Sequence, residues 1–311
     1  YNFVAVSDFG SAEALHYLLV RDSVHGAMDD DVALDGNYLV VKDQRTRLIS
    51  GGAPGTIPWD AFDVDIVIDA TGRFLKRNEL SAHLDSGAKR VCISRNAKDL
   101  IDRYVIPGVN ESSIKTSDKI ISTTSSTTQV LALMVKMLDE AFGLERAMMT
   151  TVHAYTADQP LADAAGVDLR RSRSAVENII PNSTRAPSII EDLMPQFSGK
   201  LDGIAFNVPV PNGSCVDLTT ELREMPSVQQ ANEVIKEYSE NTMKGIVGYT
   251  EDPIVSSDVI GREETMIYDE KATMITNESL LKTLCWYDNG WGFASRILDV
   301  VDAYATLEEE S

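Results

Sequence analysis

The chain of 311 residues has few cysteines and no long apolar run. Its three cysteines, Cys92, Cys215 and Cys285, lie far apart and form no C-x-x-C pair, so the sequence predicts neither a disulfide framework nor a zinc site. No apolar run approaches the ~20 residues that a membrane-spanning helix needs. No basic segment followed by an apolar one opens the chain, so secretion is not indicated. We therefore expect a cytoplasmic protein without a metal site.

Positive charge is also scarce. The sequence has 28 Lys and Arg against 48 Asp and Glu, a net charge of -20. This balance repels the phosphates of nucleic acids and anionic membrane surfaces outside any local basic patch. The hydrophobic fraction of 43% is that of an ordinary globular protein. At about 150 residues per domain, the length indicates two domains or one large one, and we expect neither a nucleic-acid nor a membrane partner.

The first 125 residues alternate short apolar runs with amphipathic stretches. The expected strands are 2–8, 64–70, 90–94 and one that begins at 119–121, and the expected helices are 12–20 and a segment around 79–84. Strands separated by helices favour crossover units and a parallel sheet with helices on its faces. The polar, Gly- and Asp-rich stretch before Val64 is expected to form a small antiparallel insertion.

The pattern changes after Ser125. Residues 127–142 predict a long apolar helix that begins at hydroxyl residues and ends at Gly143. Longer alternating segments then predict strands of an antiparallel sheet packed on helices, in α+β style. These strands are 147–155, 203–210, 214–222 and 283–288, and a last helix covers 291–304. Residues 156–178 are charged and without period, which is typical of a functional loop or one ordered by a partner.

Three features are candidates for chemistry, each with a plainer alternative. Asp8 ends a strand, where an acid can bind an adenosine ribose or cap the next helix; the residues before it contain no G-x-G-x-x-G loop. His153 ends another strand and is either a base in a cleft or a satisfied core residue. The run of Ser and Thr at 122–128 is either an anion site at a helix N-terminus or an N-cap.

Several collinear blocks resemble the glyceraldehyde-3-phosphate dehydrogenase family from about residue 1 to 305. They are DSVHG at 22–26, ATG at 70–72, TTVHA at 150–154, NIIPNST at 178–184, KGIVGYTEDP at 244–253, SSD at 256–258 and WYDN at 286–289. One such block would be weak evidence, but so many in the family's order identify the chain as a member.

The resemblance implies a two-domain α/β architecture and an assembly. Residues 1–125 would form an NAD-binding domain with a Rossmann-type doubly wound parallel sheet, completed by a C-terminal helix at 291–311. Residues 126–290 would form an α+β catalytic domain with a mixed or antiparallel sheet. The family's first strand and glycine-rich loop would lie before Tyr1. The loop 156–178 would be the family's S-loop, near the cofactor of a neighbouring subunit in a homotetramer.

The resemblance also implies roles for single residues. Ser126 falls on the family's nucleophilic cysteine, His153 on the histidine that activates it, and Asn207 on a phosphate-binding arginine. Thr123, Thr124, Gln129 and Gly290 are further departures from the family pattern. The implied NAD-binding residues are Asp8, Thr71, Ser94 and Asn289, the last of which fixes the nicotinamide carboxamide. The implied substrate phosphate-binding residues are Ser125, Thr127, Thr156 and Thr184, with Arg185 in place of the family's glycine.

These departures leave more than one function open. A cysteine at a helix N-terminus beside a histidine is readily a thiolate, whereas a serine needs a base during attack, and its oxygen ester is a poorer acyl donor. Cys92, Cys215 and Cys285 are typical of inert packing. We expect a homologue without ordinary phosphorylating activity, which binds a nucleotide or joins an active paralogue in a mixed tetramer. The alternatives are an active NAD-dependent oxidoreductase on a phosphorylated sugar aldehyde, with Ser126 an engineered or functional nucleophile, and a changed reaction such as hydrolysis.

Overall fold

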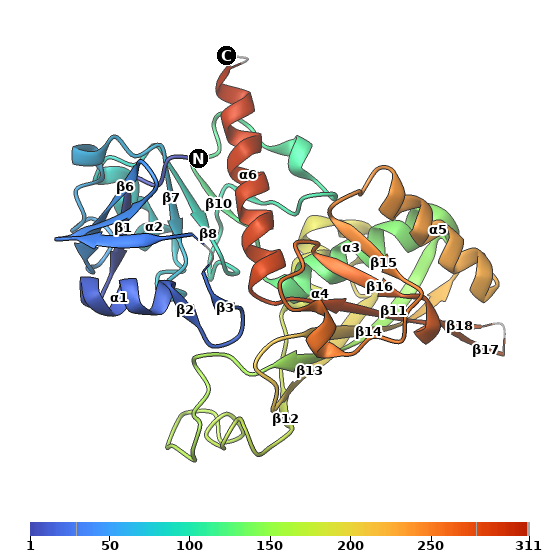
Figure 1. Cartoon of the computed structure of the whole chain (residues 1–311). Helices are drawn as coiled ribbons and strands as arrows, with labels where there is room; N and C mark the ends of the chain where they lie inside the picture. The colour runs from blue at the N-terminus through green and yellow to red at the C-terminus, as the bar shows by residue number, and fades with distance from the viewer. Residues whose placement is uncertain (29, 278, 310–311) are drawn as a thin grey trace. The chain divides into compact units, whose positions relative to one another are not determined.

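A computed structural model describes residues 1–28, 30–277 and 279–309, which divide into two compact units (Figure 1). Unit 1 contains residues 1–104, 114–123 and the C-terminal stretch from Tyr304, and unit 2 contains residues 105–113 and 124–303. The final helix thus contributes residues 291–303 to unit 2 and its end to unit 1, and residues 310 and 311 of the predicted helix lie outside the described residues. The predicted bounds of the two domains stay a prediction of the sequence.

Unit 1 contains two four-stranded sheets. The first has the order β1 (Ala5–Asp8), β6 (Gln44–Ser50), β5 (Tyr38–Val41) and β4 (Val32–Asp35). The second has the order β7 (Ile66–Asp69), β8 (Arg90–Ile93), β10 (Ile120–Ser122) and β9 (Arg103–Tyr104). β1 and β6 are parallel, β6, β5 and β4 are antiparallel, and the second sheet is parallel throughout. The expected antiparallel insertion is therefore present, and β2 (Arg21–Asp22) pairs with β3 (Gly26–Ala27).

Besides the end of the final helix, two helices and a 3-10 turn lie in the described residues of unit 1. They are α1 (Ala12–Leu19), α2 (Arg77–Asp85) and η1 (Trp59–Phe62). Leu80 of α2 is buried with Val91, Ile93 and Ile120 of the parallel sheet. Within the described residues, β1 and β7 each pair on one side only. The expectation of a further first strand outside this sequence stays a prediction.

Unit 2 is built on an eight-stranded mixed sheet. Its order is β12 (Ile180–Asn182), β13 (Leu201–Val208), β11 (Leu144–Ala154), β14 (Ser214–Leu222), β18 (Leu280–Tyr287), β16 (Met266–Asp269) and β15 (Val247–Thr250), with β17 (Met274–Thr276) paired to β18. The β11–β13 and β15–β16 pairs are parallel. The sheet is thus mixed rather than purely antiparallel.

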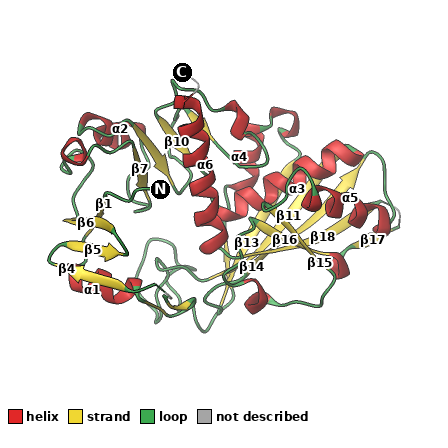
Figure 2. Cartoon of the chain, turned by 45° about the horizontal axis from the view of Figure 1, so that its top comes forward, coloured by secondary structure: helices red, strands yellow, loops and turns green. Residues whose placement is uncertain are grey.

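Unit 2 also contains helices, three of which share one hydrophobic core with this sheet. The helices are α3 (Ser126–Phe142), α4 (Ala186–Leu193), α5 (Val228–Glu240) and the start of α6 (Trp291–Glu309), and the 3-10 turns are η2 (Glu111–Ser113), η3 (Pro195–Phe197), η4 (Ser256–Val259) and η5 (Glu270–Ala272). Those in the shared core are α3, α4 and α5. α3 is buried almost throughout and packs on β11 and β14 (Figure 2). The sequence pattern predicts α3 because its apolar residues are continuous, but it misses α5, which buries only Ala231, Asn232 and Ile235.

The turn before β14 requires a glycine. Gly213 has a φ of +82°, and a Cβ at this position would lie 2.0 Å from the carbonyl oxygen of Ser256. Gly245 has a similar φ of +81° but no atom within 4 Å of the Cβ site. The two positions thus share the left-handed conformation and differ in the space around it.

We predict that Gly213→Ala lowers the free energy of unfolding by more than ~2 kcal/mol, because the clash adds to the cost of a left-handed alanine. Gly245→Ala is the matched control and should cost only about 1 kcal/mol. Urea denaturation of both variants measures the difference. Equal losses would contradict the claim that the close approach to Ser256 matters.

Candidate functional site

Ser126 is the first residue of α3, and the hydroxyl of Ser125 caps the helix. Ser125 Oγ accepts from the backbone N–H of Thr128 at 3.3 Å and lies 2.8 Å from Thr128 Oγ1. Ser126 is half-buried, and its hydroxyl makes no hydrogen bond within the part of the chain that the structure describes. A helix N-terminus offers free N–H groups and a positive dipole end. Ser126 therefore lies where a nucleophile or an anion would be stabilised. Ser125 is the N-cap residue, which is the plainer alternative that the Ser/Thr run left open.

His153 lies near the end of β11 as a neutral base. Its Nδ1 is 2.6 Å from the carbonyl oxygen of Ala154, and because a carbonyl only accepts, Nδ1 carries the proton and Nε2 keeps its lone pair. Burial lowers the pKa of His153 below its ordinary value, and this outweighs the raising effects of the Ala154 carbonyl and of Asp158. The structure describes no hydrogen bond between His153 and Ser126.

A buried chain of hydroxyl groups lies beside this histidine. The Tyr287 ring is 6.0 Å from the His153 ring at 72°, and Tyr287 OH lies 2.7 Å from Thr127 Oγ1 and 3.1 Å from Thr151 Oγ1. Thr151 donates its only proton to the carbonyl of Cys215, so Tyr287 must donate to Thr151, and Thr127 must donate to Tyr287. Burial raises the pKa of Tyr287 to about 12, which keeps this phenol protonated. The hydroxyl proton of Thr127 is thus already engaged, and its role in phosphate binding stays a prediction.

Asn207 is buried in β13 opposite His153 in the parallel β11–β13 pair. Its amide nitrogen donates to the carbonyl of Ala154 at 3.3 Å, and its amide oxygen accepts from Asn182 Nδ2 at 3.4 Å. This position therefore holds a neutral amide that is tied to the strands on both sides.

The other predicted phosphate-binding residues lie in loops or at helix starts. Thr184 Oγ1 accepts from the backbone N–H of Ala186 at 3.2 Å, and the exposed Arg185 is the N-cap residue of α4. The Thr156 hydroxyl donates to Asp158, whose other carboxylate oxygen pairs with Arg171. Residues 156–178 contain no helix or strand, in agreement with the expected loop.

Asn289 is held in place through Ser214, which the sequence analysis did not single out. Ser214 Oγ accepts from the N–H of Ala154 at 3.0 Å and donates to Asn289 Oδ1 at 3.1 Å. The backbone N–H of Asn289 donates to Asn212 Oδ1 at 3.2 Å. The structure therefore links Asn289 to the strand end that carries His153.

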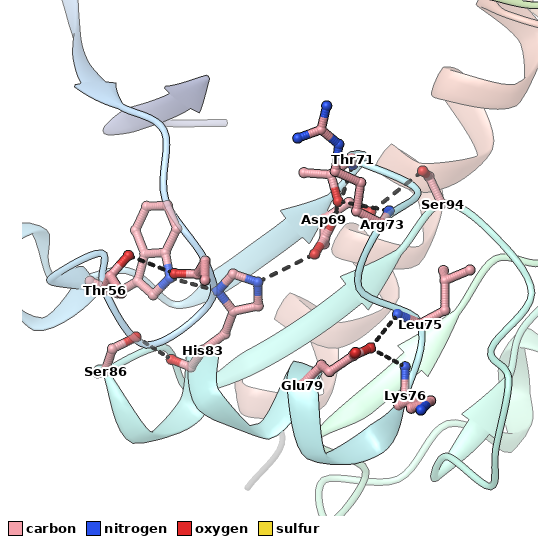
Figure 3. Close-up of polar contacts among 12 residues, drawn as sticks. Thr56, Asp69, Thr71, Arg73, Leu75, Lys76, Glu79, His83, Ser86 and Ser94 are labelled. Carbon is pink, nitrogen blue, oxygen red and sulfur yellow. Dashed lines mark hydrogen bonds and ion pairs between the residues drawn. The ribbon is translucent and has the colours of Figure 1, made fainter. Parts of the chain in front are cut away.

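The predicted cofactor residues of unit 1 lie at carboxyl ends of parallel strands. Thr71, after β7, donates its N–H at 2.9 Å and its hydroxyl at 2.6 Å to Asp69 Oδ1 (Figure 3). Ser94, after β8, donates its N–H to the Asp69 carbonyl at 3.2 Å. The Arg73 guanidinium lies 5.0 Å from the centre of the Phe9 ring, so the turns after β7 and β1 meet. Ligands of open α/β sheets bind at such strand ends.

Asp8 ends β1 with an exposed carboxylate. Its Oδ1 accepts from the N–H of Gly10 at 2.8 Å, and its carbonyl accepts from Gly51 N at 2.6 Å. A Cβ on Gly51 would lie 2.7 Å from the Asp8 carbonyl carbon, so glycine is required for this approach. The second carboxylate oxygen has no partner among the described residues, which leaves it able to accept from ribose hydroxyls.

Comparison with known proteins now adds to this geometry. The chain matches "Glyceraldehyde 3-phosphate dehydrogenase, NAD binding domain" over residues 1–77 and the corresponding "C-terminal domain" over residues 125–289. It is 42% identical over 298 residues to glyceraldehyde-3-phosphate dehydrogenase 1 of Bacillus subtilis, which covers 96% of this chain and 89% of that protein. The identity to the Geobacillus stearothermophilus enzyme is 41%, with the same coverage of both chains. The chain belongs to the glyceraldehyde-3-phosphate dehydrogenase family.

Membership confirms the Rossmann-type parallel sheet, the mixed sheet of the catalytic unit and NAD as the cofactor of this glyceraldehyde-3-phosphate dehydrogenase homologue. The free carboxylate oxygen of Asp8 fits NAD, because it can bind ribose hydroxyls and would repel the 2′-phosphate of NADP. When bound, NAD accepts a hydride. The roles of individual residues, including Ser126 and Asn207, stay predictions.

Two further observations concern the described part of the chain. No group of three or more His, Cys, Asp or Glu side chains in it is placed to hold a metal ion. None of the helices in these residues has the length and apolar character needed to cross a bilayer.

No cysteine lies in a position to replace Ser126 as nucleophile. All three cysteines are buried, and burial raises the pKa of Cys92 to about 12 and that of Cys215 to about 11. Burial also raises the pKa of Cys285 well above its ordinary value.

We predict that the native protein does not react with a thiol-specific disulfide reagent at pH 8, because its three thiols are buried, and that all three react after unfolding. Rapid reaction of even one thiol in the native protein would contradict the assignment of all three cysteines as buried and unreactive.

Proposed function

We propose that this chain is an NAD-binding homologue of glyceraldehyde-3-phosphate dehydrogenase that lacks ordinary phosphorylating activity. The observation that carries the proposal is the absence of a thiol at the N-terminus of α3: Ser126 stands there, and the cysteines are buried elsewhere in strands. A serine hydroxyl is a weak nucleophile unless a base removes its proton during attack. An oxygen ester formed at Ser126 would also transfer its acyl group to phosphate more slowly than a thioester.

The polar contacts around Asn207 support the same conclusion. A positively charged group forms hydrogen bonds to phosphate that are roughly twice as strong as neutral ones. Asn207 carries no charge, and its amide nitrogen is directed to the carbonyl of Ala154. The phosphate of a sugar phosphate would therefore depend on Ser125, Thr127, Thr156 and Thr184, with Arg185 as a nearby exposed charge.

In this proposal the chain has a binding, regulatory or assembly role. The loop 156–178 and its flank expose the apolar side chains Leu161, Val167, Leu169 and Ile179. Exposed apolar groups of this density are typical of a surface that another chain covers. We infer that this loop packs in a homotetramer or in a tetramer mixed with an active paralogue.

The second candidate function is an active NAD-dependent oxidoreductase on a phosphorylated sugar aldehyde, with Ser126 as nucleophile. His153 favours it, because its Nε2 keeps a free lone pair and its lowered pKa leaves it neutral at pH 7. A neutral imidazole could take the Ser126 proton as a general base if the two side chains came within hydrogen-bond reach.

A measurement of dehydrogenase activity distinguishes the homologue without phosphorylating activity from the active oxidoreductase. We predict no phosphate-dependent NADH formation from glyceraldehyde 3-phosphate, measured by absorbance beside the Bacillus subtilis relative as the active control. A rate within about tenfold of that relative would correspond to a barrier difference below about 1.4 kcal/mol and would overturn the proposal.

We predict that Ser126→Cys alone restores little activity, because the position of Asn207 still provides no charge for the phosphate. Ser126→Cys combined with Asn207→Arg should recover more, although the arginine must displace the amide from the Ala154 carbonyl. Ser126→Cys with Asn207→Gln is the matched control, since it adds length without charge. Full recovery with the single change would show that Ser126 alone prevents activity, as expected of an engineered or recently inactivated enzyme.

A further inference from the structure

Three buried polar side chains form a line in unit 1 that ends at the cofactor turn. Trp59 of η1 is 6% exposed, His83 of α2 is 4% exposed, and Asp69 at the end of β7 is 6% exposed. Trp59 Nε1 lies 2.9 Å from His83 Nδ1. His83 Nε2 lies 3.4 Å from Asp69 Oδ2, and Figure 3 shows these two side chains facing each other. No role predicted for NAD binding uses Trp59 or His83.

The donors in this line can be assigned by elimination. An indole N–H only donates, so His83 Nδ1 must be the acceptor and carry no proton. The ring proton is then on Nε2, which faces the Asp69 carboxylate and donates to it. His83 therefore connects Trp59 to Asp69 as a neutral imidazole with a fixed tautomer.

The carboxylate of Asp69 also forms hydrogen bonds with the turn after β7. Its Oδ1 accepts both the N–H and the hydroxyl of Thr71, and Thr71 Oγ1 accepts in turn from the N–H of Arg73 at 3.2 Å. Burial would raise the pKa of Asp69, but hydrogen bonds from His83 and Thr71 outweigh it, so the pKa lies below its ordinary value. Gly72, with a φ of +63°, completes the turn. One carboxylate oxygen is thus oriented by His83 and the other holds the turn.

We propose that His83 is a positioning residue for NAD: it orients Asp69, and Asp69 holds the turn at Thr71 and Gly72 in the shape that receives the cofactor. The inference rests on the predicted role of Thr71 in NAD binding. It makes Trp59 and His83 part of the cofactor site although neither touches the cofactor. It also explains why a histidine is buried with a carboxylate beneath a strand end instead of an apolar pair.

A purely structural role would make the same contacts, so the test must separate stability from binding. Glu79, on the same helix α2, provides the comparison. Its Oε2 accepts from the N–H groups of Leu75 and Lys76 at 3.1 and 3.0 Å, and within the described residues it forms no hydrogen bond with His83 or Asp69. Glu79→Gln weakens the helix start without altering the line of buried groups.

The experiment measures NAD binding by calorimetry to the full chain and to its variants His83→Leu, His83→Gln and Glu79→Gln. Each is compared at a temperature where circular dichroism shows it folded. We expect His83→Leu to weaken NAD binding by at least about fivefold, because the Asp69 carboxylate loses one charge-assisted hydrogen bond and its orientation. His83→Gln should stay within about threefold, because its amide can accept from Trp59 and donate to Asp69. Glu79→Gln should lower the unfolding temperature and leave the affinity unchanged.

Other outcomes would overturn the proposal. Unchanged affinity in His83→Leu, or equal losses in His83→Leu and His83→Gln, would leave His83 with a packing role only. If His83→Leu does not fold, Trp59→Phe provides the test, because it frees His83 Nδ1 and should weaken NAD binding by a smaller factor; unchanged affinity there would also refute the role. Failure of the unmodified chain to bind NAD would instead contradict the cofactor assignment itself, and the absence of dehydrogenase activity would bear on neither result.

Discussion

The backbone N–H and carbonyl of Ala154 at the end of β11 are the constraint on which the candidate catalytic site depends. Its carbonyl accepts from the His153 ring and from the Asn207 amide, and its N–H donates to Ser214, which donates to Asn289. Side chains from three strands and from the segment after β18 are therefore oriented by the backbone of one residue. Because each of these bonds is partly or fully buried, breaking any of them would leave a polar group unpaired at a cost of about 1–3 kcal/mol.

This arrangement couples the chemistry of His153 to the residue at position 207. The carbonyl of Ala154 fixes the proton on Nδ1 and leaves the lone pair on Nε2, and Asn207 shares that same acceptor. A longer charged side chain at position 207 would release the shared acceptor and strengthen the remaining bond to His153. The side chain at position 207 thus affects the surroundings of the His153 ring, and its proposed effect on phosphate binding is not independent of this contact.

The sequence predicted some parts of this site and could not predict others. Ser126 at the start of α3 follows from the Ser/Thr run and the apolar helix after it, both of which are local patterns. The link from Ser214 to Asn289 joins residues 75 positions apart, and no periodicity or spacing brings such partners together. Asp69 was missed for the same reason, since its partner His83 is on the next helix. In the fold, continuous apolar segments such as α3 were predicted, whereas α5 was not because it buries few residues.

In each of the two units, one buried acceptor receives hydrogen bonds from two side chains. The carbonyl of Ala154 accepts from the buried Asn207 amide and from the His153 ring, and the carboxylate of Asp69 accepts from the buried His83 and from Thr71. A surface turn or a strand end alone would sample several conformations, because solvent can replace its hydrogen bonds at little cost. A buried partner removes that freedom, since water cannot replace the inner contact. Residues at the sheet edges, such as His153 and Thr71, are thus positioned by buried groups behind them.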